Sequence, residues 1–205
     1  MTRTLTGLYD SHADAASTVR DLEAAGISHE HISLVANNSG ERYRSKVREG
    51  NEAGTGAGAG AAFGGVVGGG VGLLAGLGML AIPGVGPVVA AGWLVATAVG
   101  VVGGAAVGGA GGGLIGAMIG NGIPEEDAHF YAEGIRRGGT LVTVRVEDHL
   151  ALKAEAIMHE YRRVDPITRR NAYREAGWTR FDETAPPYTH EEIARDQALR
   201  SSTMP

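Results

Sequence analysis

The strongest constraint on this chain is a long uncharged block in which glycine returns at every fourth position. The 72 residues from Ala53 to Pro124 contain no Asp, Glu, Lys or Arg, although such residues make up 20% of the chain. Glycine accounts for 34 of the 205 residues, well above its usual share of about 7%. Two regular rows stand out: Gly56, Gly60, Gly64, Gly68, Gly72 and Gly76, and then Gly100, Gly104, Gly108, Gly112, Gly116 and Gly120.

In an α-helix, the glycines of each row would lie on one face. Four residues make a little over one turn of an α-helix, so each row forms a groove without side chains along one face. Glycine inside a helix in water costs about 1 kcal/mol relative to alanine, whereas in lipid such grooves let helices approach closely and associate. The rows therefore predict two zipper helices, over about 54–81 and 88–120. Both exceed the roughly 20 residues that span a bilayer core.

The middle of the uncharged block reads as a turn between these helices. Pro83, Gly84, Gly86 and Pro87 lie together between the two glycine rows, and prolines bracketing glycines do not continue a helix. The sequence thus predicts a transmembrane helical hairpin over 53–122. The charged linker that precedes it, 38–52, is expected at the membrane surface through its basic residues, which are Arg42, Arg44, Lys46 and Arg48.

The segment before the linker has the pattern of a soluble domain. Residues 4–10 alternate apolar and polar side chains as a half-buried strand does. Ser11 or Asp10 then caps a helix that runs to about Ala25, and residues 31–36 form a second strand. Residues 1–37 are therefore predicted to be the first half of an α+β domain.

The segment after the uncharged block supplies the second half, over 123–167. A helix begins at Pro124 with acids in its first turn, residues 140–146 are the clearest strand of the chain, and Asp148 caps a further helix. Residues 164–167 are predicted to form a short edge strand, because Pro166 cannot donate to a sheet ladder. This order is that of a ferredoxin-like split β-α-β domain, interrupted by the hairpin.

The polar tail, 168–205, is predicted to be extended or partly disordered. Its aromatic residues, Tyr173, Trp178, Phe181 and Tyr188, are expected to dock on the protein's own domain rather than on a partner.

The chain contains the motifs Gly-Leu-Tyr-Asp at 7–10, Ala-Ile-Pro-Gly-Val-Gly-Pro at 81–87 and Gly-Ile-Pro-Glu-Glu-Asp-Ala at 122–128. With their flanking stretches they resemble one known family, the bacterial heat-induced general stress protein domain in its glycine-zipper membrane version. The similarity covers roughly residues 5–164. It implies a stress-induced, membrane-associated protein without an established molecular activity or catalytic residues. The stretches that carry it are 7–10 with 22–27 and 32–36, then 81–87, and then 122–128 with 138–144.

Composition excludes several kinds of chemistry. The chain has no cysteine, so it has no disulfide, thiolate metal site or cysteine nucleophile. The glycine-rich start of the block lacks the Lys-Ser/Thr and acidic partners of nucleotide-binding loops, and no basic face interleaved with aromatics indicates nucleic acid. His29 and His31 around Glu30 read as a polar turn rather than a metal site. No enzyme activity, cofactor or metal is predicted.

These observations favour a non-enzymatic membrane protein that forms homo-oligomers through its zipper helices and has a structural or envelope-protective role. The positive-inside rule places both termini on the cytoplasmic side of the bacterial inner membrane. Two alternatives remain open. The hairpin anchors a ligand-binding or regulatory domain, or the hairpins of many copies form the buried core of a soluble assembly. The sequence identifies no small-molecule ligand.

Overall fold

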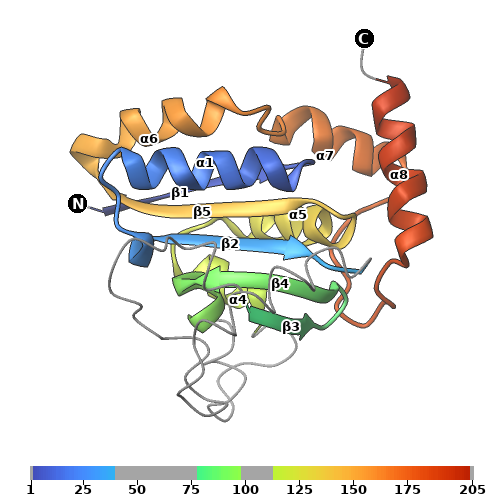
Figure 1. The fold of residues 1–205 in the computed structure, drawn as a ribbon. Coiled ribbons are helices and arrows are strands. Elements are labelled where there is room, and N and C mark those ends of the chain that lie inside the picture. The colour runs from blue at the N-terminus through green and yellow to red at the C-terminus, as the bar shows by residue number, and fades with distance from the viewer. Residues whose placement is uncertain (1, 40–77, 98–112, 204–205) are drawn as a thin grey trace.

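The computed structural model describes residues 2–39, 78–97 and 113–203 of the chain. They form a mixed α+β fold around one five-stranded antiparallel sheet with the strand order β1-β5-β2-β4-β3 (Figure 1). The strands are β1 (Thr2–Tyr9), β2 (Ile32–Asn37), β3 (Gly78–Ile82), β4 (Gly86–Gly92) and β5 (Thr140–Glu147). The predicted mixed α+β class is confirmed.

The first half of the domain folds as its pattern indicates. Helix α1 (His12–Ala24) begins after Ser11, whose side chain accepts a hydrogen bond from the backbone of Asp14. It connects β1 to β2, and β5 lies between these two strands, antiparallel to both. A short 3-10 turn, η1 (His29–His31), precedes β2. The two halves of the chain therefore share one sheet, as the sequence predicts.

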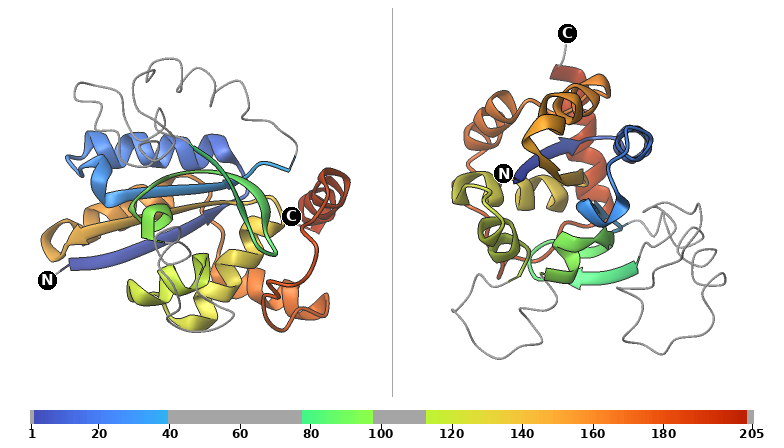
Figure 2. Two further views of the ribbon diagram at one scale, coloured as in Figure 1. Left: turned by 90° about the horizontal axis from the view of Figure 1, so that it is seen from below. Right: turned by 90° about the vertical axis from the view of Figure 1, so that its left-hand side faces the viewer.

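Helices cover both faces of this sheet (Figures 1 and 2). On one face α1 and α6 (Asp148–Glu160) pack through Leu22 and Met158 against β2 and β5. On the other face α4 (Leu114–Gly120) and α5 (Glu125–Arg136) pack through Met118 and Ile135. Every residue of β2 is buried. Neither face of this strand meets water, and its polar Ser33 donates a hydrogen bond to the carbonyl oxygen of Ala91 at 2.9 Å.

The centre of the uncharged block belongs to the sheet, which corrects the prediction of two helices meeting at a turn. The turn itself is present, since residues 83–85 join β3 to β4, but the flanking residues are strands rather than helices. Strand β4 pairs with β2 on one side and β3 on the other, and Val88 and Val89 are fully buried. A short apolar run without charges suits a strand buried on both faces as well as a helix, and its β-branched residues favour the strand.

Most of the predicted zipper lies outside the described residues. This holds for the first glycine row, for Gly100 to Gly112 of the second row, and for the basic cluster Arg42, Arg44, Lys46 and Arg48. Gly116 and Gly120 lie in α4, which is 7 residues long and packs on the domain. Residues 93–97 are helical. Among the described residues, no helix has both the length and the apolar character that crossing a bilayer requires.

Two predictions for the C-terminal part are wrong. Residues 164–167 do not form a strand: Val164 donates one backbone hydrogen bond to Leu8 of β1, at 2.8 Å. Asp165 then caps helix α7 (Pro166–Glu175), because Pro166 suits the first position of a helix better than the interior of a sheet. The tail is not extended, since α7 and α8 (His190–Thr203) make up most of it.

Candidate functional site

The described part of the C-terminal tail is attached to α5 by arginine–carboxylate pairs. Helix α5 begins with three acidic residues, Glu125, Glu126 and Asp127, which the sequence explains by the helix dipole alone. The fold adds a cationic partner for each of them. Arg180 Nη2 lies 2.9 Å from Glu125 Oε1, Arg174 Nη2 lies 2.7 Å from Glu126 Oε1, and Arg170 pairs with Asp127.

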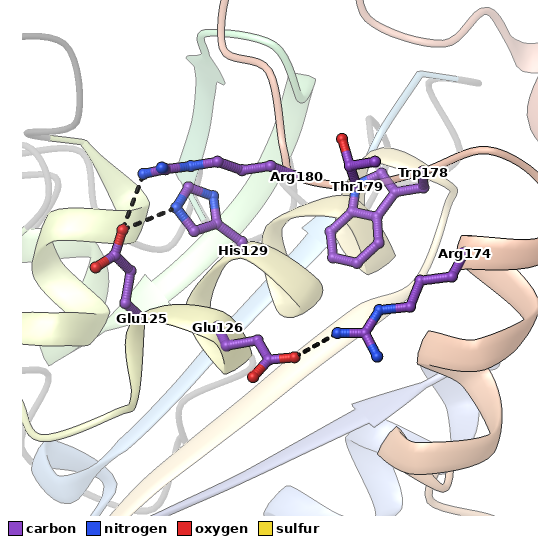
Figure 3. Close-up of a pocket in the computed structure, with 7 residues that line it drawn as sticks. All are labelled: Glu125, Glu126, His129, Arg174, Trp178, Thr179 and Arg180. Carbon is purple, nitrogen blue, oxygen red and sulfur yellow. Dashed lines mark hydrogen bonds and ion pairs between the residues drawn. The ribbon is translucent and has the colours of Figure 1, made fainter.

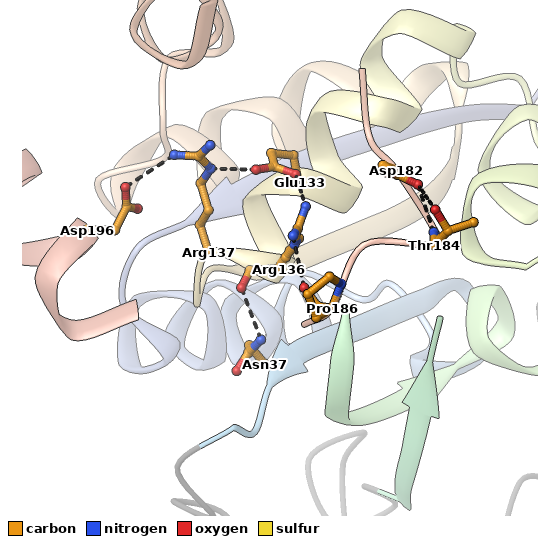
Figure 4. Close-up of polar contacts among 8 residues, drawn as sticks. All are labelled: Asn37, Glu133, Arg136, Arg137, Asp182, Thr184, Pro186 and Asp196. Atoms are coloured by element: carbon orange, nitrogen blue, oxygen red, sulfur yellow. Dashed lines mark hydrogen bonds and ion pairs between the residues drawn. The ribbon is translucent and has the colours of Figure 1, made fainter. Parts of the chain in front are cut away.

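A second set of contacts fixes the other end of α5, as Figure 4 shows. Glu133 is only 1% exposed, and its Oε1 accepts a hydrogen bond from Arg137 Nε at 2.6 Å. Arg137 Nη1 also lies 3.2 Å from Asp196 of α8. Arg136 donates to the carbonyl oxygen of Pro186 at 2.9 Å. The buried carboxylate of Glu133 therefore orients two guanidinium groups that both hold the tail.

The pKa of Arg137 in this cluster depends on its burial and on its contact with Glu133. Burial of Arg137 opposes its charged form, but the hydrogen bond and the charge of Glu133 more than offset this, so the pKa of Arg137 is raised. The guanidinium carbon also lies 4.4 Å from the ring centre of Tyr173, a cation–π contact. Both contacts stabilise the charged form of Arg137 inside the domain.

A pocket of about 370 Å³ lies between α5 and the tail (Figure 3). Glu125, Glu126 and His129 line it from α5, and Arg174, Trp178, Thr179 and Arg180 line it from the tail. The two arginines are paired with the two glutamates across the pocket. Formal charge in the lining therefore cancels, provided that His129 is neutral.

His129 is the most distinctive side chain of this pocket. The residue is 8% exposed, and neither ring nitrogen has a hydrogen-bond partner in the described part of the chain. Glu125 Oε1 lies 3.6 Å from His129 Nε2, beyond hydrogen-bonding distance. Burial, and then the charge of Arg180, lower the pKa of His129 below 6.5. The lowered pKa favours the neutral form of the ring, whose Nε2 faces the carboxylate of Glu125.

The indole of Trp178 completes the polar groups without partners. Its Nε1 is buried and has no hydrogen-bond acceptor among residues 2–39, 78–97 and 113–203. The ring packs edge-on against Tyr173, with the ring centres 6.0 Å apart. Trp178 and His129 therefore line the pocket, with their ring nitrogens buried in its wall.

Within the described ranges no three His, Cys, Asp or Glu side chains lie close enough together to hold a metal ion. His29 and His31 lie in η1 and are exposed, as expected for a polar turn.

The predicted turn residues have a role that the sequence alone does not show. Gly84 and Gly86 adopt positive φ angles of 71° and 94°, which L residues other than glycine rarely adopt. A side chain at Gly84 would lie 2.7 Å from the carbonyl oxygen of Asp182, and one at Gly86 would lie 2.7 Å from Pro187. The tail thus crosses directly over the β3–β4 turn.

Docking of the tail aromatics on their own domain is confirmed for two side chains. Tyr173 and Phe181 are 2% and 5% exposed and belong to the core. The arginine–acid pairing was not predicted, although the chain carried a signal for it. Arg170 and Arg174 lie four residues apart on one helical face, and the acidic cluster at 125–127 has the complementary charge.

Comparison of the chain with protein-family models, with curated proteins and with solved structures finds no match.

Proposed function

We propose that the protein is a non-enzymatic, stress-associated membrane protein that forms homo-oligomers through its glycine-zipper segments. In this proposal the α+β domain lies on the cytoplasmic face of the bacterial inner membrane and has a structural or envelope-protective role. The regular spacing of the two glycine rows is the sequence basis for the proposal.

The observation that carries the proposal is where the sheet attaches the two zipper segments. The first segment ends at Gly78, which pairs with Ala90 of β4. The second segment follows Gly92, which pairs with Ser33 of β2. Because β3 and β4 are neighbours, both attachment points lie at the same end of the sheet. This favours contact between the two glycine rows, and it favours entry of both segments into a bilayer from one side.

The position of Trp93 is consistent with a bilayer at this end of the sheet. It follows β4 directly at this end of the sheet, and its indole donates a hydrogen bond to the carbonyl oxygen of His31 at 3.0 Å. The guanidinium carbon of Arg145 lies 3.6 Å from the centre of its ring. An indole beside a cation suits the headgroup region of a membrane.

We also propose that the soluble domain is a ferredoxin-like variant. The order β1-β5-β2 with α1 and α6 on one face is consistent with that architecture. Helices α4 and α5 cover the other face, so the sheet is not free to pair face to face with another sheet.

The membrane proposal is tested by fractionation of a bacterium that expresses the full chain. Retention of the protein in membranes through an alkaline carbonate wash, followed by extraction as a defined oligomer in detergent, is the expected result. Gly64→Leu within the first row should reduce the oligomer, whereas the matched control Gly70→Leu, outside both rows, should not. Recovery of the protein as a large detergent-free particle from the cytosol would refute membrane insertion and favour a soluble zipper core.

The pocket at His129 favours a second candidate, a membrane-anchored ligand-binding module. Its lining, in which two arginine–glutamate pairs cancel in formal charge beside the indole of Trp178, suits a small, uncharged molecule. Native mass spectrometry of the purified chain should then detect a bound molecule that is lost in Trp178→Phe, which keeps an aromatic side chain but replaces the indole with a smaller ring that has no N–H. The same occupancy in both proteins would exclude this site.

A further inference from the structure

The outer edge of the sheet at β1 is open over part of its length. Strand β1 pairs with β5 along one side, from Thr2 opposite Glu147 to Tyr9 opposite Thr140. On its other side, the only backbone hydrogen bond that the described residues supply comes from the N–H of Val164 to the carbonyl oxygen of Leu8. As far as residues 2–39, 78–97 and 113–203 show, the sheet therefore ends in an edge strand that is closed at Leu8 only.

The contact at Leu8 determines which backbone groups point outward. In an antiparallel strand the N–H and C=O of one residue point to the same side, and successive residues alternate. Since the carbonyl of Leu8 points away from β5, the backbone groups of Thr2, Thr4 and Thr6 point away from it too. These three residues form a row of donors and acceptors along the edge.

This edge has few of the features that protect edge strands from pairing. Residues 2–6 contain no proline, and the register with β5 continues without a bulge. Arg3 is the only charged residue in this stretch, and its Nε lies 3.1 Å from Asp148 Oδ1. β-Branched threonines at alternate positions favour strand pairing.

We propose that residues 2–6 of β1 pair with the same residues of a second copy of this chain, antiparallel, about a two-fold axis at Thr4. Thr4 is the midpoint of the stretch that Val164 leaves open. In this register Thr2 faces Thr6 of the second copy and Arg3 faces Leu5 of the second copy, so like charges do not face each other.

Neighbouring registers are less favourable. A two-fold axis at Arg3 would place the two Arg3 side chains opposite each other, and like charges directly opposite are destabilising. A two-fold axis at Leu5 would bring Thr2 of the second copy beside Leu8, where Val164 already donates its hydrogen bond. The paired sheets would form one continuous sheet through residues 2–6 of each copy, so this dimer does not depend on the proposed function.

Single cysteines test this register directly, because the natural chain contains no cysteine. Full-length Thr2→Cys and Thr6→Cys proteins are purified, mixed in equal amounts, oxidised and separated on a non-reducing gel. Facing residues in the proposed register are about 5.5 Å apart, within the range that a disulfide bridges. Two Thr2 positions would be about 14 Å apart, which excludes a disulfide between them.

A disulfide-linked dimer in the mixture at several times the amount found in either protein alone is the expected result. Gly64→Leu placed in both proteins should leave this dimer unchanged, which separates edge pairing from zipper association. Equal cross-linking in the mixture and in the single proteins, or none in any of them while tryptophan fluorescence shows a native fold, would overturn the proposal.

Discussion

Removal of the Glu133 carboxylate should cost the domain much of its stability. The group is 1% exposed and faces both Arg137, at 2.6 Å, and Arg136, at 3.6 Å. In Glu133→Ala the guanidinium of Arg137, a residue only 9% exposed, keeps Asp196 as its remaining carboxylate partner. Breaking a buried pair by removing one partner costs about 3 kcal/mol, so we expect a loss of that size in the free energy of unfolding.

Two matched variants separate the ion pair from other effects. The double variant Glu133→Met with Arg137→Met removes both charges and keeps the volume, so its stability should lie within about 1 kcal/mol of the natural chain. Glu125→Ala breaks the exposed pair with Arg180 and should cost less than about 1 kcal/mol.

Urea unfolding of the full chain provides the measurement, with fluorescence of the only two tryptophans, Trp93 and Trp178, as the signal. All variants are compared in the same buffer or detergent. The reasoning is refuted if Glu133→Ala costs no more than Glu125→Ala, because the buried carboxylate would then contribute no more than an exposed one.

Three further predictions concern the tail and its pocket. Gly84→Ala places a side chain 2.7 Å from the carbonyl oxygen of Asp182 at a φ of 71°, so limited proteolysis should cut the tail faster than in the natural chain; an unchanged rate would contradict the close approach. The folded-state pKa of His129 is lowered below 6.5, so protonation favours the unfolded chain and stability should fall as the pH drops below about 6.5. Urea midpoints measured against pH should fall less in His129→Gln, and parallel curves for the two proteins would argue against this. Asp165→Ala removes the cap that accepts from the Thr168 N–H at 2.7 Å and should cost about 1 kcal/mol, whereas Asp165→Ser should recover most of it by the same unfolding measurement.

The elements with strong local signals were predictable from the sequence. Ser11 caps α1 as expected, and the alternating run at 140–146 forms β5. Helix α5 begins at Glu125, with Pro124 as its cap. In each case a short pattern decides the structure, because capping and alternation depend on neighbouring residues.

The secondary-structure predictions were wrong where the local sequence pattern is compatible with two different structures. The apolar run at 86–92 suits a buried strand and a membrane helix equally, and only its pairing with β2 and β3 decides between them. Pro166 ends the predicted edge strand, but it also begins α7 once Asp165 provides a cap. The pocket could not be predicted, since it forms between α5 and the tail, which are brought together by ion pairs between distant segments.

The position of β4 has a mechanical consequence. A pull on the chain beyond residue 97 passes through the helical residues 93–97 to β4, which is hydrogen-bonded along its length to β2 and β3. The component of such a force along β4 loads many hydrogen bonds at once in shear, instead of opening them one by one. The sheet can thus resist tension that the second glycine segment transmits to β4.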